Sequence, residues 1–302
     1  MNIRRFLLAL TFAVTVFPVL GLHAEAPKKL RVFVPVLPYE YLFERVGGNW
    51  INVSAIVQEG GDCHNYSPSP RQITDISRAN LLFSGGLSFE GNFFVAVGDG
   101  INSPKEINLS EGIELLEGSC EECEKAHTEG REPTHKHETG ELKDMHVWLS
   151  PRVLLHQATR VAAILKQNLP AEAAPEIDAN LASLNADLTQ LDKDLKEMLA
   201  PMKGQAFYVY HAAFAYFAAD YGLVQKAIEI GGRTPSPKQV AALAKQAKEE
   251  GVKAIFVQPQ FDQSSAQSLA ETIGGKVQTL DPLEKDVIAN LRVIAETIRS
   301  AQ

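Results

Sequence analysis

The sequence has little cysteine and, beyond Leu22, no apolar run long enough to cross a bilayer. Its 302 residues include three cysteines, Cys63, Cys120 and Cys123. These are too few for a disulfide-rich scaffold, and their odd number leaves at least one thiol without a partner in the chain. The metalloprotease pattern His-Glu-x-x-His is also missing. With 45% hydrophobic and 22% charged residues, the chain has the composition of an ordinary globular protein.

The N-terminus has the three parts of a secretory signal peptide. Arg4 and Arg5 precede an almost uncharged run over residues 6–22, and Ala24 supplies a small residue at its end. We therefore predict that residues 1–24 are a cleaved signal peptide and that the mature chain is periplasmic. A retained membrane anchor is the alternative. No cysteine lies at the cut, which argues against a lipid anchor of the bacterial type.

The chain is acidic, with a formal net charge of −8. Loss of the signal peptide removes two arginines and no acid, which takes the net charge to −10. An acidic surface repels nucleic acid and anionic membranes and attracts cations. We therefore predict no nucleic-acid partner, and a metal ion is a reasonable ligand.

Short apolar stretches alternate with helical stretches from Leu30 to the C-terminus, which predicts parallel sheets with helices on their faces. The predicted strands are 30–36, 51–57, 81–84, 206–210, 223–230, 254–257 and 277–280. The longest helical segment carries one apolar stripe, formed by Leu181, Leu184, Leu188, Leu191 and Leu195. We predict an α/β protein with an N-terminal lobe (25–169), a linking helix (170–201) and a C-terminal lobe (202–302). A straight linking helix would limit hinge motion, because bending it breaks its own hydrogen bonds.

Residues 111–144 interrupt this alternation. The stretch holds 11 acids and 4 bases, with almost no apolar periodicity, and it is typical of a solvated loop. It also contains the histidines His127, His135 and His137. Two interpretations stay open for them: a weak accessory metal site, or an ordinary acidic loop.

Four potential metal ligands occupy equivalent places in the predicted fold. His64 follows the strand 51–57, His211 follows 206–210, and Asp281 follows 277–280, while His146 lies between the acidic loop and a helix. Ligands of open α/β sheets bind beyond the carboxyl ends of the strands. We therefore expect these four side chains to meet in the cleft between the lobes. Taken singly, each histidine is more often a structural residue, and Asp281 followed by proline is typical of a helix start.

The chain resembles the cluster A-I solute-binding proteins of bacterial ABC transporters, which capture zinc or manganese, over nearly all of residues 29–302. Four segments carry the resemblance: GDCHNYSPSP (61–70), HVWLSP (146–151), HAAFAYF (211–217) with YGL (221–223), and LDPL (280–283). The resemblance implies metal ligands at His64, His146, His211 and Asp281, two lobes joined by one long helix, and delivery of the metal to a membrane permease. We expect a monomer without catalytic activity.

Three imidazoles and one carboxylate suit Zn²⁺ in a tetrahedral site, whereas Mn²⁺ prefers more oxygen ligands. The resemblance supports zinc as well, since manganese-binding relatives commonly have glutamate where this chain has His211. Two positions depart from the family. Cys63 replaces a common proline and is either an extra soft donor or an inert buried thiol. Gln258 stands where relatives often have glutamate.

Other functions also fit parts of the pattern. The same pocket would serve Mn²⁺ or another divalent metal, and it would also serve a metal buffer or adhesin without a transporter. A secreted zinc hydrolase needs an open ligand position and a general base, which fits four protein ligands poorly. A binding protein for an anionic organic ligand is disfavoured, because arginine is missing from the four segments.

Overall fold

Parallel strands flanked by helices build both halves of the chain, in agreement with the predicted fold class. The computed structural model describes residues 29–97, 104–118, 143–229, 236–261 and 263–301. The predicted signal peptide, Cys120, Cys123 and the three loop histidines lie outside these residues. Among the helices that the structure describes, none has both the length and the apolar character that crossing a membrane requires.

The sheet of the first lobe has four parallel strands in the order β2-β1-β3-β4. They are β1 (Leu30–Val34), β2 (Ile51–Ala55), β3 (Leu81–Ser84) and β4 (Lys105–Asn108), connected by α1 (Leu37–Gly47), α2 (Pro70–Ile76) and α3 (Glu90–Val97). Strands β1 and β2 pair in register along their whole length, so both end at the same edge of the sheet. Strand β4 was not predicted, because its sequence Lys-Glu-Ile-Asn contains a single apolar residue.

The sheet of the second lobe repeats this arrangement, with the order β6-β5-β7-β8. Its strands are β5 (Ala206–Val209), β6 (Val224–Ala227), β7 (Ala254–Val257) and β8 (Lys276–Thr279), with helices α7 (Ala215–Tyr221), α8 (Pro237–Glu249) and α9 (Ser264–Ile273). Binding sites in such sheets lie beyond the strand ends, where the order of connection reverses. That point falls beside β1 in the first lobe and beside β5 in the second.

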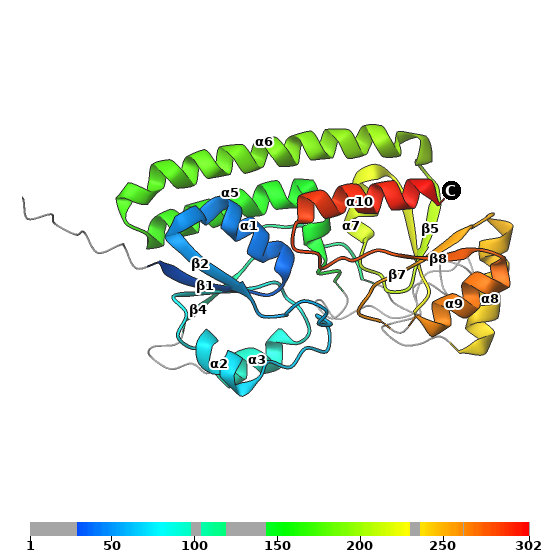
Figure 1. Cartoon of the computed structure of the whole chain (residues 1–302), viewed down its shortest axis with the longest axis horizontal. Coiled ribbons are helices and arrows are strands. Elements are labelled where there is room, and N and C mark those ends of the chain that lie inside the picture. Colours follow the sequence, from blue (N-terminus) through cyan, green and yellow to red (C-terminus); the bar gives the residue numbers. More distant parts are fainter. Residues whose placement is uncertain (1–28, 98–103, 119–142, 230–235, 262, 302) are drawn as a thin grey trace, which may run out of the picture.

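Three further helices lie on one side of the molecule (Figure 1): α5 (Pro151–Asn168), α6 (Ala174–Leu199) and α10 (Val287–Ser300). The 26 residues of α6 span about 39 Å and pass over both lobes (Figure 1). Its apolar stripe faces inward, with Ile177, Leu184, Leu188, Leu191, Leu195 and Leu199 fully buried. The predicted linking helix 170–201 thus corresponds to α6 with one 3-10 turn at each end, Ala171–Ala173 and Ala200–Met202.

The two lobes share one apolar core. It includes Val34 from β1, Leu188 from α6, Phe217 from α7, Phe256 from β7 and Leu291 from α10. A second and smaller apolar cluster lies within the C-terminal lobe, between its sheet and the helices α8 and α9. Because the main core continues from one lobe into the other, a change in the angle between the lobes would expose apolar surface.

Polar contacts also join the lobes close to the predicted cleft. The indole nitrogen of Trp148 donates a buried hydrogen bond to the carbonyl oxygen of Pro282, at 2.7 Å. The hydroxyl of Tyr216 donates to the carbonyl oxygen of Asp144, at 2.9 Å. A buried donor that loses its acceptor costs about 1–3 kcal/mol, so these bonds hold the cleft-forming segments in one arrangement.

Candidate metal centre

His64 lies in the loop that connects β2 to α2. Its backbone N–H donates to Oδ1 of Asp62 at 2.8 Å, and Oδ2 of the same carboxylate accepts from the Asn65 amide at 2.8 Å. Ser88, in the loop after β3, donates its hydroxyl to the carbonyl oxygen of His64 at 3.0 Å. The loop is therefore fixed from both sides, and the His64 ring projects from it into the cleft.

His146 is almost completely buried, with 4% of its surface exposed, and precedes the single turn Val147–Leu149. Oδ1 of Asp144 accepts from the backbone N–H of His146 and contacts its Nδ1, both at 2.8 Å. A carboxylate at Nδ1 holds the proton on that nitrogen. Nε2 is then left with a free lone pair, which is the form that binds a metal.

His211 follows β5 and is supported by the ends of two neighbouring strands. Its Nδ1 contacts the carboxylate of Glu229, which follows β6. Gln258, directly after β7, accepts from the backbone N–H of His211 at 3.2 Å and donates to its carbonyl oxygen at 2.7 Å. The ring of Phe261 stacks on the His211 imidazole at 5.0 Å. The side chain, its backbone and its tautomer are thus all fixed.

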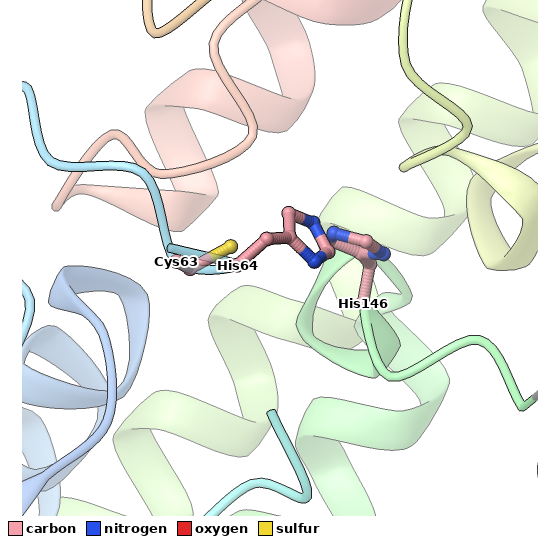
Figure 2. Close-up of side chains that lie close together, drawn as sticks. All are labelled: Cys63, His64 and His146. Carbon is pink, nitrogen blue, oxygen red and sulfur yellow. The ribbon is translucent and has the colours of Figure 1, made fainter. Parts of the chain in front are cut away.

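The three histidines converge on one point. Nε2 of His64 lies 2.9 Å from Nε2 of His211, which lies 3.4 Å from Nε2 of His146. Two nitrogen ligands each about 2.0–2.1 Å from a tetrahedral Zn²⁺ are roughly 3.3 Å apart. Figure 2 shows the rings of His64 and His146 side by side. The 3.4 Å spacing matches what one such ion requires, and the 2.9 Å spacing is slightly shorter.

The environment keeps the His64 imidazole in its metal-binding form. Burial is the main cause that lowers the pKa of His64 from its ordinary value to about 3, and the neighbouring rings of His146 and His211 contribute to the same shift. Only the neutral imidazole has a lone pair for a metal, so His64 needs to lose no proton at neutral pH before an ion binds.

Asp281 lies beyond the end of β8, at the same edge as His211 and Glu229. Its Oδ1 accepts from the Gln260 amide and from the backbone N–H of Leu283, both at 2.9 Å. Asp281 makes no ion pair with a histidine in the part of the chain that the structure describes. It lines a cavity of about 330 Å³ between the lobes, together with residues that include Gln58, Gln260 and Lys285.

Asp281 is not a helix cap, which corrects the alternative interpretation from the sequence. The last helix, α10, begins at Val287, and its N-cap is Asp286, whose Oδ1 accepts from Ala289 N at 3.0 Å. Asp281 instead closes a tight turn, while Asn290 of α10 donates to its carbonyl oxygen at 2.7 Å.

Three functional side chains were missed by reasoning from the sequence. Asp144 and Glu229 orient His146 and His211, and Gln260 holds Asp281. Asp144 lies two residues before His146, and Glu229 follows a strand at the same edge as His211. The position of each acid in the sequence could therefore have indicated its role. Gln258 is explained by the structure, because its amide both donates to and accepts from the backbone of His211, which an ionised glutamate cannot do.

The fold and the site together define a two-lobed binding protein with a histidine-lined metal centre between its lobes. The chain belongs to the family described as "Zinc-uptake complex component A periplasmic" (ZnuA), whose model matches residues 32–301. This confirms the predicted family and, with it, the role of a periplasmic zinc-binding component of an uptake system. The identity of the metal ligands stays a prediction.

Similar proteins agree with this assignment. A putative metal-binding protein of Chlamydia muridarum is 29% identical over 294 residues, which are 96% of this chain and 98% of the relative. The zinc-binding protein AdcA of Streptococcus pyogenes serotype M3 is 31% identical over 86% of this chain, which spans about half (51%) of AdcA. A crystal structure of ZnuA matches with a TM-score of 0.81 and 32% identity, covering 91% of this chain and 99% of its own.

A second solved structure resembles the chain nearly as well. It is a ZnuA deletion mutant, lacking residues 138–173 in its own numbering and bound to zinc. It has a TM-score of 0.79 and 32% identity, and the match covers 91% of this chain and 98% of that one.

Proposed function

We propose that the mature chain captures Zn²⁺ with His64, His146, His211 and Asp281 and delivers it to the permease of an ABC transporter. The observation that supports this most strongly is the convergence of three Nε2 atoms, at 2.9 and 3.4 Å, from histidines that come from both lobes. Two of these rings have a carboxylate at Nδ1, the usual support of a zinc-bound histidine.

The donor set favours Zn²⁺ over Mn²⁺. Three neutral imidazoles offer nitrogen, and the single proposed oxygen ligand is Asp281. Zn²⁺ is stable with four such ligands in a tetrahedron, whereas Mn²⁺ favours six oxygen-rich ligands. Asp144 and Glu229 add negative charge around the site without binding the ion, which lowers the cost of burying a dication.

Asp281 completes the site in this proposal. The two hydrogen bonds that the described residues make to its carboxylate, from Gln260 and Leu283, both go to Oδ1, so Oδ2 is the oxygen that would turn to the metal. Once four protein ligands surround the ion, no position remains for a reactive water. A catalytic zinc needs such a position, so we expect capture without turnover.

The proposed release of Zn²⁺ depends on the fact that its ligands come from both lobes. His64 and His146 belong to the first lobe, and His211 and Asp281 to the second. A permease that draws one of these segments away by a small distance therefore removes one of the four ligands and opens the site. We further propose that cleavage follows Ala24 and that the mature chain acts as a monomer.

The test strips the mature chain of metal and offers it Zn²⁺, Mn²⁺, Fe²⁺ and Cu⁺ together in equal amounts. We expect tightly held Zn²⁺, one ion per chain, that is lost in the variants His64→Ala and His211→Ala. Asp178→Asn, which disrupts only an exposed ion pair with Lys166, is the matched control and should retain the ion. Zinc retained in both histidine variants would overturn the ligand assignment, and preference for Mn²⁺ would overturn the choice of metal.

A further inference from the structure

Cys63 is a buried thiol beside the metal centre that zinc capture does not use. The residue is 4% exposed and belongs to the apolar core that the two lobes share. It is a free thiol. Its neighbour in sequence, His64, is one of the proposed zinc ligands.

The sulfur lies within reach of two histidines. Sγ of Cys63, a ring nitrogen of His64 and a ring nitrogen of His146 all lie within 4.8 Å of one another. Figure 2 shows the sulfur on the side of Cys63 that faces the His64 ring, with His146 beyond it. Sulfur binds metals at about 2.3 Å and imidazole nitrogen at about 2.0–2.1 Å, so ligands of one ion are separated by up to roughly 4 Å. Small side-chain rotations bring the three atoms to that spacing.

We propose that Cys63, His64 and His146 form a second ligand set in the cleft, which binds a soft monovalent cation of the Cu⁺ type. The inference rests on the proposed function, because the two sets share His64 and His146. They differ in the remaining ligands, which are His211 and Asp281 for zinc and Cys63 for copper. The two ions therefore compete for the cleft and do not occupy it together.

The chemistry of sulfur and the burial of the thiol both favour this cation. Thiolate is the softest ligand among protein side chains and selects Cu⁺. Binding forms a Cu–S bond and breaks the S–H bond, and the proton passes to water with no change of oxidation state. A monovalent ion and a thiolate leave no net charge among neutral imidazoles. A buried metal–thiolate pair without net charge avoids the desolvation cost of an uncompensated ion.

The test measures Cu⁺ and Zn²⁺ affinities of the mature chain without oxygen, by competition with a chromogenic chelator for each ion. The variants are Cys63→Ala, Cys63→Ser and Asp281→Asn. We expect both Cys63 variants to lose more than about tenfold in Cu⁺ affinity, with little change for Zn²⁺. Asp281→Asn should show the opposite pattern. Loading the parent with Cu⁺ should produce a thiolate-to-metal charge-transfer band in the ultraviolet that neither Cys63 variant shows.

Three results would overturn the inference. They are unchanged Cu⁺ affinity in both Cys63 variants, a Cu⁺ complex of the parent without the thiolate band, and equal loss of Cu⁺ and Zn²⁺ in both variants, which would make Cys63 a structural support. Retained zinc affinity shows that a Cys63 variant is folded. Failure of the zinc proposal is distinguishable, because it appears as zinc binding that is insensitive to His211→Ala while Cu⁺ binding still depends on Cys63.

Discussion

A carboxylate beside each of two histidines, His146 and His211, decides which nitrogen of the ring is available to a metal. Asp144 holds Nδ1 of His146, and Glu229 holds Nδ1 of His211. Both rings therefore present Nε2 to the same point, where His64 meets them. At this scale the site depends as much on the two carboxylates as on the rings, since a ring with the wrong tautomer or orientation binds no metal.

Replacing either carboxylate by its amide should weaken zinc binding without removing a ligand. For Glu229→Gln and Asp144→Asn we expect a loss of about 10–100-fold in Zn²⁺ affinity, because the ring loses its basicity and its fixed orientation. Competition with a zinc chelator measures this. Asp178→Asn, a change of the same kind on the exposed face of α6, is the control. Affinities equal to that of the control would show that the carboxylates do not support the site.

Stability of the metal-free chain should depend on pH through His64. The pKa of this imidazole is about 3 in the folded chain and about 6.5 in the unfolded chain, so the unfolded chain binds the proton more readily. The folded chain therefore loses stability as the pH falls below about 6.5, by up to about 1.4 kcal/mol per pH unit. Above about pH 7, His64 has no effect on stability.

Glu90 changes the stability in the opposite direction as the pH falls. The contribution of His64 must therefore be measured as a difference between two proteins. Burial raises the pKa of this carboxyl to about 7, which favours the folded chain as the pH falls toward about 4.5. Urea unfolding between pH 5 and 7.5 should therefore be compared for the parent and His64→Gln, in which only the His64 contribution is missing. Parallel pH profiles for the two proteins would refute the assignment of a depressed pKa to His64.

At the scale of elements, the carboxyl ends of the strands determine where the site lies. In the second lobe the residues that follow β5, β6, β7 and β8 supply, in turn, His211, Glu229, Gln258 and Asp281. All four strands are parallel, so their carboxyl ends meet at one edge. In the first lobe the loop after β2 carries His64, and the loop after β3 fixes it through Ser88. Short strands with no functional side chains thus determine where His64, His211 and Asp281 lie, whereas His146 lies just before α5.

Helix α6 is the element on which both lobes pack. Truncating its buried Leu188 to alanine should lower the free energy of unfolding by about 2–5 kcal/mol, through lost apolar contact and the cavity left behind. Both lobes should unfold in one transition, because they share this core. Thermal unfolding followed at several wavelengths measures it, with the exposed Lys193→Ala on the same helix as control. Two separate transitions in the variant would contradict the shared core.

The sequence predicted an element where that element has a clear pattern of apolar residues. The leucines of α6 recur at spacings of three and four residues, and most of the strands are short apolar runs. The local sequence was therefore enough to predict these elements. Strand β4, with one apolar residue, carries no such period. The positions of His64, His146 and His211 were predicted from strand ends and from family resemblance. The partners Asp144, Glu229 and Gln260 were not, because such contacts depend on the paths of loops through space.

At the scale of the whole molecule, the two lobes form a frame with little freedom to hinge. The apolar core extends through both lobes, and α6 spans them. Trp148 also donates a hydrogen bond across the interface to the carbonyl oxygen of Pro282. Opening this frame widely would expose apolar surface and break buried hydrogen bonds. Metal capture is therefore expected to involve loops and side chains at the cleft.

Small-angle scattering of the metal-free and zinc-loaded chain should give radii of gyration that agree within experimental error. This follows from the shared core, since zinc can reorder the His64 loop and Asp281 without moving a lobe. Hydrogen exchange would then show protection confined to the loops that follow β2, β5 and β8. Clear compaction on addition of zinc would mean that the lobes close as rigid bodies, against this account.

The central claim is that three imidazoles and the Asp281 carboxylate bind one zinc ion, and X-ray absorption at the zinc edge tests it most directly. For the zinc-loaded mature chain we expect a tetrahedral set of nitrogen and oxygen ligands at about 2.0–2.1 Å, including three imidazoles. The Asp281→Ala variant should show one protein oxygen replaced by water. A sulfur neighbour at about 2.3 Å, or only two imidazoles in the parent, would contradict the assignment of His64, His146, His211 and Asp281 as the zinc ligands.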